Sequence, residues 1–313
     1  MEPSFPKNET IMDRLDAMSI LVATVEAGSF TGASKVLRTP LATVSRKVSE
    51  LEAHLGVQLL MRTTRKLFLT DAGEAYVAAS RRILEEVREA ERAASGEYET
   101  PSGELVLTAP VLFGRLHLLP IVAEFLAAYP DITVRLSLSD RNLHLVDDHL
   151  DMAVRIGVLP DSSMIATRIG AMRTVVCAAP KLLSGHGAPE RPADLASMPC
   201  VSFEPFPGPS VWTFRRPDGR GAVEVPIAPR LSVTTAEAAV SAASQGVGVT
   251  RVLYYQCEEA VRNGALCILL SEYEPVALPV HLIHAPRSRL PLKMRSFLDF
   301  ASERLRDRLN GLR

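Results

Sequence analysis

The sequence predicts an α/β fold overall, preceded by a small all-α module and one long helix. Apolar residues recur at steps of three and four between residues 13 and 55, which is the period of short amphipathic helices. A single helical pattern then covers residues 71–95. From Gly103 onward, strand-like and helix-like segments alternate, a pattern that favours α/β structure with mostly parallel sheets.

Length and composition indicate a soluble protein with more than one domain. The 313 residues suffice for two or three hydrophobic cores, and shares of 47% hydrophobic and 23% charged residues are ordinary for globular proteins. The polar start of the chain has no secretory h-region, and no apolar run approaches the roughly 18–20 residues that a membrane span needs. We therefore expect a cytoplasmic protein that makes no membrane contact.

The cysteines argue against a metal site. None of Cys177, Cys200, Cys257 and Cys267 forms a CxxC pair, so we expect no metal ligands among them. The favoured interpretation treats them as small buried apolar side chains. A redox switch between Cys257 and Cys267 is the alternative.

Charge is distributed unevenly along the chain. The formal net charge is −1, which by itself argues against a general nucleic-acid binder. Between Lys35 and Lys66, however, seven basic residues stand against two acidic ones, so this stretch carries a local charge of +5. Such a local excess is expected of a small DNA-contacting module, although a solvated helix face would show it as well.

Capping residues divide residues 13–55 into three helices. The first is expected to end at Gly28, a natural C-cap, and Ser29 to cap a second helix that runs to Leu37. Thr39 is the expected N-cap of the third helix, with Pro40 at its first position.

The third helix is amphipathic. Its apolar stripe comprises Leu41, Val44, Val48, Leu51 and Leu55. At about 100° per residue, Ala42, Arg46 and Ser49 point the opposite way, and Thr43 and Ser45 lie on the flanks. Small side chains around one arginine suit the major groove, where arginine bonds bidentately to guanine. An ordinary amphipathic surface helix is the alternative interpretation.

Two further segments complete the N-terminal part. After Gly56, two extended runs flank residues 62–66, as in a hairpin wing that grips the phosphate backbone and adds salt-dependent affinity. Thr70 is then expected to cap the long helix. Its apolar seam consists of Ala72, Tyr76, Ala79, Ile83, Val87, Ala90 and Ala94. A narrow seam between mixed charges predicts pairing with a partner helix, and packing on the chain's own domain is the alternative.

The α/β region offers binding loops and no catalytic motif. In open α/β sheets, ligands bind beyond the C-terminal ends of strands and near helix N-termini, which here means residues 109–111, 139–141 and 234–235. Each of these segments alone also fits a structural turn or cap. Residues 246–248 lack the third glycine of a dinucleotide motif, and no GxSxG or HExxH occurs. We therefore expect no enzymatic activity, no catalytic residues and no cofactor.

Residues 27–73 closely resemble the DNA-binding segment of LysR-type transcriptional regulators. The marks that carry the resemblance are Gly28-Ser29-Phe30, Ala33, Leu37, Thr43-Val44-Ser45-Arg46, Leu51-Glu52, Leu55-Gly56, Arg62 and Leu69-Thr70 followed by Ala72-Gly73. The run Arg62-Thr63-Thr64-Arg65 is typical of one large branch of that family. The resemblance continues more loosely through residues 127–136, 151–157 and 245–249.

The resemblance implies a winged helix-turn-helix at residues 12–70, a dimerising linker helix and hinge at 71–100, and a periplasmic-binding-protein-like effector-binding domain at 101–313. Lobe I of that domain is expected at about 104–173 and 278–313, and lobe II at about 174–277. Residues 1–11 are expected to be a disordered tail unless the chain starts at Met12.

Site residues follow from the same resemblance by position. Contacts to DNA are expected from Thr43, Ser45, Arg46, Ser49, Arg62, Arg65 and Lys66. Contacts to a small-molecule effector are expected from Pro110, Val111, Ser139, Asp140, Phe203, Thr234 and Thr235. The implied partners are a two-fold symmetric DNA site, other copies of the chain in a dimer or tetramer, and RNA polymerase.

Some positions depart from the family pattern. Leu41 and Ala42 replace a common polar residue and proline, and Ala109-Pro110 stands where a hydroxyl is frequent. Gly32 replaces an alanine, which weakens its helix by about 1 kcal/mol. Two rival hypotheses are a cytoplasmic solute-binding or enzymatic α/β protein with a vestigial helix-turn-helix, and a thiol redox sensor on the same scaffold.

Overall fold

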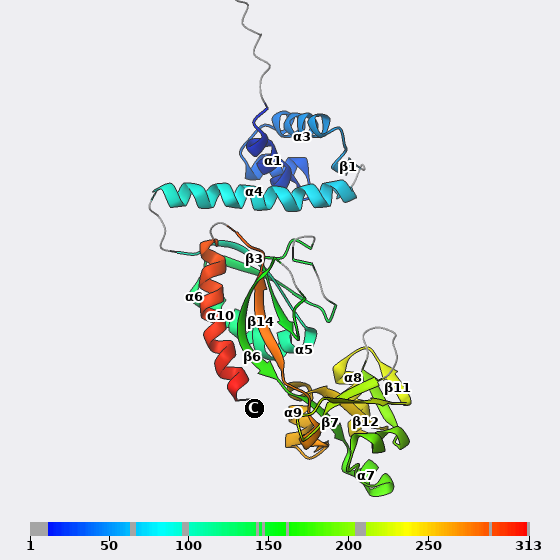
Figure 1. Ribbon diagram of the computed structural model, residues 1–313. Coiled ribbons are helices and arrows are strands. Elements are labelled where there is room, and N and C mark those ends of the chain that lie inside the picture. The colour runs from blue at the N-terminus through cyan, green and yellow to red at the C-terminus, as the bar shows by residue number, and fades with distance from the viewer. Residues whose placement is uncertain are drawn as a thin grey trace, which may run out of the picture. The chain divides into compact units, whose positions relative to one another are not determined.

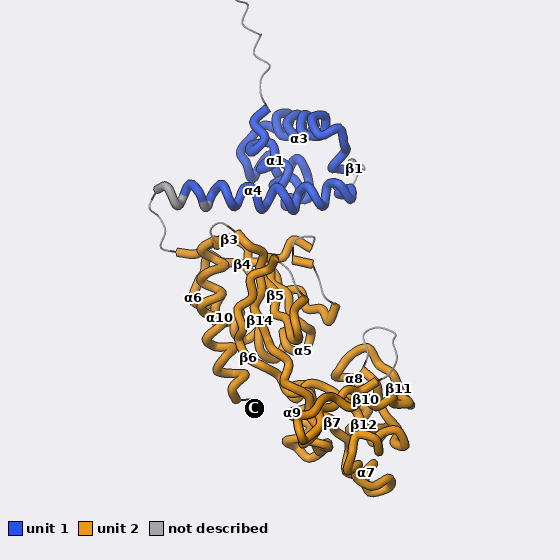
Figure 2. The backbone as a smooth tube through the Cα atoms, viewed as in Figure 1, with its two compact units in different colours: residues 1–99 blue, residues 100–313 orange. Residues whose placement is uncertain are grey.

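The computed structural model describes residues 12–62, 67–95, 100–141, 144–145, 148–160, 163–203, 211–287 and 290–311. The chain divides into two units, residues 1–99 and residues 100–313, which Figure 2 shows in different colours. The first unit is mainly helical, and the second contains two mixed sheets with their helices (Figure 1).

The first unit packs three short helices, a hairpin and a long helix around one core. Its elements are α1 (Arg14–Glu26), α2 (Phe30–Val36), α3 (Leu41–Leu55), β1 (Leu60–Arg62), β2 (Leu67–Leu69) and α4 (Asp71–Ser95). Its buried apolar residues are Ala17, Ile20, Leu21, Ala33, Val44, Val48, Leu51, Leu59, Leu60 and Val77. The small helical module and the hairpin predicted from the sequence are confirmed.

The turn between α2 and α3 differs from the prediction at one residue. The Ser29 hydroxyl accepts the Gly32 N–H at 3.0 Å, which confirms it as the cap of α2. Thr39 is not the cap of α3, because its hydroxyl donates to the Leu37 carbonyl at 3.1 Å instead. Pro40 therefore occupies the cap position without a side-chain hydrogen bond.

The core-facing stripe of α3 is shorter than predicted. Its middle members are fully buried, whereas Leu41 is 46% exposed and Leu55 is 36% exposed. Both stand at the ends of a 15-residue helix, beyond the part that packs on the other helices. The predicted stripe is thus right for three positions and wrong for two.

Two features fix the start of α4: an N-cap at Thr70 and the close packing of Gly73 against the Leu59 backbone. The Thr70 hydroxyl accepts the Gly73 N–H at 2.9 Å, as predicted for the cap. A Cβ at Gly73 would lie 2.0 Å from the Leu59 carbonyl oxygen, so this position requires glycine.

The remainder of α4 divides into a packed part and an exposed part. Val77 and Ser80 are buried, and Arg81 pairs with Glu26 of α1 at 3.3 Å. Ile83, one turn further on, is 39% exposed. The first three turns therefore pack on the chain's own unit, which is the alternative noted from the sequence, while Ile83 and Ala90 of the seam beyond them are exposed.

The second unit contains two five-stranded sheets. The first sheet has the order β4-β3-β5-β14-β6, with β3 (Gly103–Ala109), β4 (Ile132–Leu138), β5 (Met152–Ile156), β6 (Ile165–Met172) and β14 (Leu278–His284). The second sheet has the order β11-β8-β12-β7-β13, with β7 (Thr174–Ala178), β8 (Cys200–Phe203), β11 (Pro229–Val233), β12 (Val249–Leu253) and β13 (Cys267–Leu269).

These sheets are mixed, and the expectation of mostly parallel pairing was wrong. β3 runs parallel to β4 and β5, but β14 runs antiparallel to β5 and β6. In the second sheet, β8 pairs parallel with β11 and β12, whereas β7 pairs antiparallel with β12 and β13. The cause is topological: β6 carries the chain out to the second sheet and β14 carries it back, so the two strands run in opposite directions.

Helices and a hairpin cover the sheets. The helices α5 (Val111–Phe113), α6 (Leu119–Ala128) and α10 (Leu292–Asn310) belong to the first sheet, and a π-helical turn (Gly114–Leu118) joins α5 to α6. The second sheet carries α7 (Pro180–His186), α8 (Ala236–Ser244), α9 (Tyr254–Arg262), the 3-10 helices Pro192–Ser197 and Ser271–Tyr273, and the hairpin β9 (Val211–Arg215) and β10 (Ala222–Pro226).

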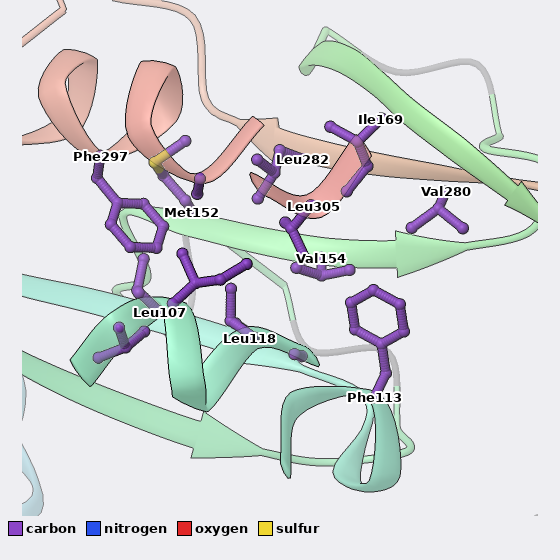
Figure 3. Close-up of a cluster of buried hydrophobic side chains, with 14 of the residues drawn as sticks. Leu107, Phe113, Leu118, Met152, Val154, Ile169, Val280, Leu282, Phe297 and Leu305 are labelled. Carbon is purple, nitrogen blue, oxygen red and sulfur yellow. The ribbon is translucent and has the colours of Figure 1, made fainter. Parts of the chain in front are cut away.

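The core of the first sheet lies between the sheet and the helices α6 and α10. Leu107, Met152 and Val280 from the strands meet Phe297 and Leu305 from α10 (Figure 3). The second sheet has an apolar cluster on each face, one under the β9–β10 hairpin and one under α8 and α9.

One helical run is longer and more apolar than the sequence analysis expected of any segment in this chain. Within the described residues, Val111–Ala128 is long and apolar enough to cross a membrane by length and composition. The apolar side chains that this run buries in the core of the first sheet are Leu112, Phe113, Leu118, Ile121, Val122 and Phe125. The run is thus the core helix of that sheet.

Candidate DNA-binding surface and effector loops

The α3 helix presents one polar face to solvent. Arg46 and Ser49 are exposed, and Thr43 and Ser45 are half-buried on the flanks. The opposite face, with Val44 at its centre, is fully buried in the core of the first unit. The predicted division of this helix is therefore confirmed in its middle turns, at Val44, Val48 and Leu51. Its outer face has the small side chains and single arginine that fit a major groove.

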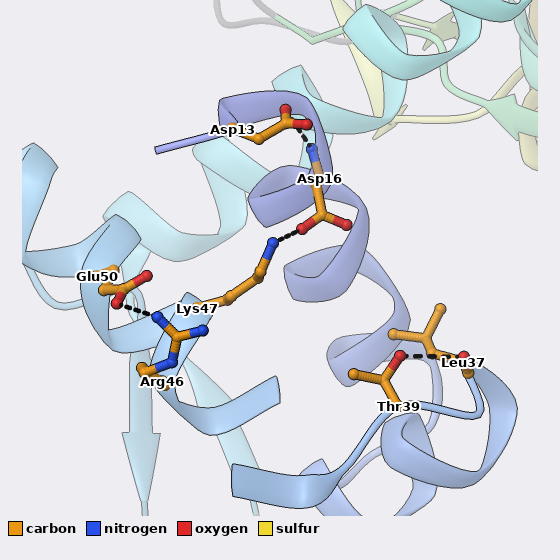
Figure 4. A network of polar contacts seen from close by, with 7 residues as sticks. All are labelled: Asp13, Asp16, Leu37, Thr39, Arg46, Lys47 and Glu50. Carbon is orange, nitrogen blue, oxygen red and sulfur yellow. Dashed lines mark hydrogen bonds and ion pairs between the residues drawn. The ribbon is translucent and has the colours of Figure 1, made fainter. Parts of the chain in front are cut away.

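The two basic residues of α3 have different partners (Figure 4). The Arg46 guanidinium lies 2.7 Å from the Glu50 carboxylate, one turn along the same exposed face. The Lys47 ammonium instead pairs with Asp16 of α1, so it fastens α3 to its neighbour. Exposed pairs contribute only about 0.2–1 kcal/mol, so Arg46 can exchange Glu50 for a base or a phosphate at small cost.

The hairpin follows α3 at a position set by one carboxylate. β1 and β2 are antiparallel with Leu60 opposite Leu69, and Arg62 ends β1. A single Glu52 oxygen accepts the N–H groups of Leu59 and Leu60 at 2.8 and 3.0 Å, which ties the last turn of α3 to β1. The predicted contact residues Arg65 and Lys66 lie outside the described residues.

The role of Glu52 was missed in the sequence. This residue was noted only as a family mark, yet its carboxylate sets where the hairpin begins relative to α3. An acidic residue inside a basic stretch was the available signal, because such a residue repels DNA and therefore needs a structural reason.

Four of the predicted effector residues meet at the C-terminal ends of β3 and β4. Pro110 opens α5, and the Val111 N–H donates to the Asp140 carboxylate at 3.0 Å. The Ser139 N–H donates to the Ala109 carbonyl at 2.9 Å, which joins the two loops. The α5 N-terminus, which would otherwise attract an anionic ligand, is thus occupied by the chain's own Asp140.

The other three predicted effector residues gather on the second sheet. Phe203 ends β8 opposite Val233 of β11, so Phe203 and Thr234 lie at the same sheet edge. The Thr235 hydroxyl accepts the Ala238 N–H at 3.3 Å and caps α8. Thr234 and Thr235 are exposed, and Phe203 is half-buried.

Contacts join the helices of the two sheets close to these loops. The Arg115 guanidinium lies 2.7 Å from the Glu237 carboxylate in the first turn of α8. The rings of Phe113 and His117 lie 5.7 and 5.5 Å from the ring of Tyr255 in α9. Single-sequence reasoning missed these residues, because no local pattern relates positions more than 100 residues apart.

Burial keeps the His117 and Tyr255 side chains neutral. Burial, with a smaller effect of Arg308, lowers the pKa of His117 to about 4. Burial also raises the pKa of Tyr255 above its usual range. The His117 Nε2 atom has no hydrogen-bond partner among the described residues, which is costly for a buried polar atom.

The cysteines lie in the second sheet and its helices as free thiols. Cys177, Cys200 and Cys257 are buried, as the favoured interpretation predicted, and Cys267 is half-buried. The Cys257 thiol donates to the Tyr254 carbonyl at 3.4 Å and the Cys267 thiol donates to the Ala178 carbonyl at 3.3 Å. A hydrogen bond with Cys257, together with burial, raises the pKa of the Cys177 thiol. Within the described residues, no cluster of His, Cys, Asp and Glu is suited to a metal ion.

The first unit has an exposed helix face suited to DNA, and the second has two sheets with loops at their strand ends. These features define a DNA-binding regulator with a ligand-binding domain. Two family models match this division: the bacterial regulatory helix-turn-helix protein, lysR family, at residues 15–74, and the LysR substrate binding domain at residues 99–306. The chain belongs to the LysR family of transcription regulators.

Relatives of known role agree with this assignment. The chain is 35% identical over 296 residues to an HTH-type transcriptional repressor of Pseudomonas aeruginosa (strain UCBPP-PA14), covering 93% of this chain and 92% of that protein. It is 34% identical over 283 residues to the HTH-type transcriptional activator AaeR of Escherichia coli (strain K12), covering 90% and 91%. These relatives are regulators, so the chain is a regulator and not an enzyme.

Solved structures of LysR-type regulators share the fold. CrgA, a LysR-type transcriptional regulator from Neisseria meningitidis, is 30% identical with a TM-score of 0.59, covering 93% of this chain and 98% of that one. The virulence activator AphB of Vibrio cholerae is 28% identical with a TM-score of 0.57, covering 92% and 98%. The fold class predicted from the sequence is confirmed.

Proposed function

We propose that this regulator reads a two-fold symmetric DNA site through Thr43, Ser45, Arg46 and Ser49 of α3. The observation that carries the proposal is the exposure of this face opposite a fully buried stripe. Arg46 would supply bidentate contact to guanine, while Arg62, Arg65 and Lys66 of the wing would contact phosphates. Residues 12–70 would form the DNA-binding domain.

Dimerisation is proposed to occur through the outer part of α4. Beyond the turns that pack on α1, the seam of this helix is exposed at Ile83, and a partner α4 would cover it. Residues 71–100 would then form the linker that joins two DNA-reading modules, and further contacts between dimers would give a tetramer. Such an assembly on promoter DNA in the cytoplasm would be placed to contact RNA polymerase.

The effector is proposed to bind between the two sheets of the second unit. Pro110, Val111, Ser139 and Asp140 line one side, and Phe203, Thr234 and Thr235 line the other. A ligand that prefers one spacing of the sheets shifts the population toward that spacing, and this is how binding would alter the DNA-reading geometry. The rival hypothesis of a vestigial helix-turn-helix has no support from the intact, fully packed first unit.

The experiment is salt-dependent binding of the full-length protein to its own upstream DNA, measured by fluorescence anisotropy. The wild-type protein should bind with an affinity that falls steeply as salt rises. Arg46→Ala should weaken binding, whereas Arg216→Ala, an exposed arginine beyond β9 in the second unit, should leave it unchanged. Absence of DNA affinity at low salt would reject the proposal.

A further inference from the structure

Within the described residues, the chain passes between the two sheets of the second unit at two crossings. The first crossing is Arg173 alone, because β6 ends at Met172 and β7 begins at Thr174. The return crossing, residues 270–277, lies between β13 and β14. Hinges are formed by a few residues at the ends of elements, which absorb changes in backbone angle. A change in the spacing of the two sheets must therefore be absorbed at these two crossings.

A bidentate ion pair joins the two crossings. The Arg173 guanidinium donates from Nε and Nη2 to the two carboxylate oxygens of Glu274, at 2.9 and 2.8 Å. The Glu274 side chain is only 15% exposed, and its hydrogen bonds with Arg173 raise the pKa of the guanidinium. Paired N–H donors fix the orientation of a carboxylate as well as its distance. The two crossings are therefore held to each other in one geometry.

The first crossing also holds the start of α9. The Tyr254 N–H donates to the Arg173 carbonyl at 2.9 Å, and the Arg173 Cζ atom lies 5.2 Å from the centroid of the Tyr254 ring. The next residue, Tyr255, is buried, and its ring contacts Phe113 and His117 beside the first sheet. Arg173 thus anchors the residue that precedes the aromatic contact between the two sheets.

We propose that the Arg173–Glu274 pair is a clasp that limits how far the spacing of the two sheets can change. While the clasp is formed, the two crossings flex together and hold α9 in place against the first sheet. When it is broken, each crossing flexes separately, so the sheets sample a wider range of spacings. The clasp requires neither DNA nor an effector, so it is a conformational device beyond the proposed function.

A second bidentate pair in the same unit provides a matched control. Arg135 of β4 donates to both carboxylate oxygens of Glu104 in β3, at 3.1 and 2.6 Å. These two strands are neighbours in the first sheet and are already paired along their length. Glu104→Gln therefore removes the same kind of interaction without altering a crossing, and it should leave the spacing of the two sheets unchanged.

The test is pulsed electron–electron double resonance of the full-length protein, which measures the distribution of distances between two spin labels. The labels are attached at Glu303→Cys in α10 and Lys181→Cys in α7, two exposed positions, in a Cys267→Ser background. Excess unlabelled protein keeps the measured distances within one chain. Glu274→Gln should widen the distribution about twofold relative to the unsubstituted clasp, because the crossings are no longer held together.

A second variant separates loss of the clasp from other effects. Arg173→Gln should widen the distribution as much as Glu274→Gln, and the double variant should widen it no further, because all three remove one interaction. Arg173→Gln also serves if Glu274→Gln fails to fold. An unchanged width in these variants, additive widening in the double variant, or equal widening by Glu104→Gln would overturn the clasp.

Discussion

The guanidinium of Arg115 lies 2.7 Å from the carboxylate of Glu237 and joins a helix of the first sheet to a helix of the second. Arg115 belongs to the π-helical turn Gly114–Leu118, as does His117, whose ring contacts Tyr255 of α9. π-helical turns are rare and occur frequently at functional sites. This turn therefore provides both polar and aromatic contacts between the two sheets.

The Arg115–Glu237 pair should contribute measurably but weakly to stability. Both side chains are about half exposed, so a double-mutant cycle with Arg115→Ala and Glu237→Ala should give a coupling free energy of about 0.2–1 kcal/mol. The coupling is measured by urea denaturation of the two single variants and the double variant. It should shrink as salt rises, because exposed charges are screened. Strict additivity at low salt would contradict the pair.

Acid should destabilise the second unit through His117. The pKa of His117 is about 4 in the folded protein against an ordinary 6.5, because burial disfavours the imidazolium. The unfolded chain takes up this proton as the pH falls through 6.5, while the folded chain does not until about pH 4. Above about pH 6.5, neutral His117 therefore costs the folded protein no stability. As the pH falls from there to about 4, His117 lowers the free energy of unfolding by about 2–3 kcal/mol.

The dependence of the unfolding free energy on pH is measured by urea denaturation between roughly pH 7.5 and pH 4, a range that covers both pKa values of His117. His117→Phe should flatten the fall in unfolding free energy, because phenylalanine does not titrate and leaves no unsatisfied nitrogen. His144→Gln, at an exposed histidine, should keep the wild-type slope. An unchanged slope in His117→Phe would show that His117 does not cause the acid sensitivity.

Two glycine substitutions should act in opposite directions. Gly73→Ala places a Cβ 2.0 Å from the Leu59 carbonyl oxygen and should destabilise the first unit by about 1–3 kcal/mol or more. Gly185→Ala, within α7, meets nothing within 4 Å and should stabilise its helix by about 0.5–1 kcal/mol. Thermal unfolding of the two variants measures both effects. A neutral Gly73→Ala would contradict the close approach of Gly73 to the Leu59 carbonyl.

Lys47 and Arg46 should separate structural from DNA-reading roles. Lys47→Met removes the pair with Asp16 and should lower the stability of the first unit by about 0.2–1 kcal/mol. It should leave the salt dependence of DNA binding nearly unchanged, since the ammonium is occupied by α1. Anisotropy titrations at several salt concentrations provide the comparison with Arg46→Ala. If Lys47→Met reduced the salt dependence of DNA binding as much as Arg46→Ala does, Lys47 would have to contact DNA.

Local patterns in the sequence predicted the first unit well. The apolar period in the middle of α3 and the Ser29 and Thr70 caps are confirmed, because each depends on residues within one or two turns. Thr39 was misjudged because the Leu37 carbonyl, two residues away, competes for its hydroxyl. The spacing of apolar residues does not reveal such competition between hydrogen-bond partners.

Long-range relations were beyond the sequence. The directions of β6 and β14 depend on how the chain passes between the sheets, which an alternation of strands and helices does not encode. Likewise, no local pattern relates Arg115 to Glu237, 122 positions later. The effector loops could be placed at strand ends, but the occupation of the α5 N-terminus by Asp140 required the structure.

The most direct test of DNA reading by α3 pairs a change in the protein with a change in the DNA. Dissociation constants are measured for the wild-type protein and Arg46→Ala, each with the natural operator and with versions in which single guanines are replaced by adenine. At one symmetric guanine position, the wild-type protein should lose about 1–3 kcal/mol of binding free energy while Arg46→Ala loses almost nothing. Equal losses for both proteins at every position would contradict the account.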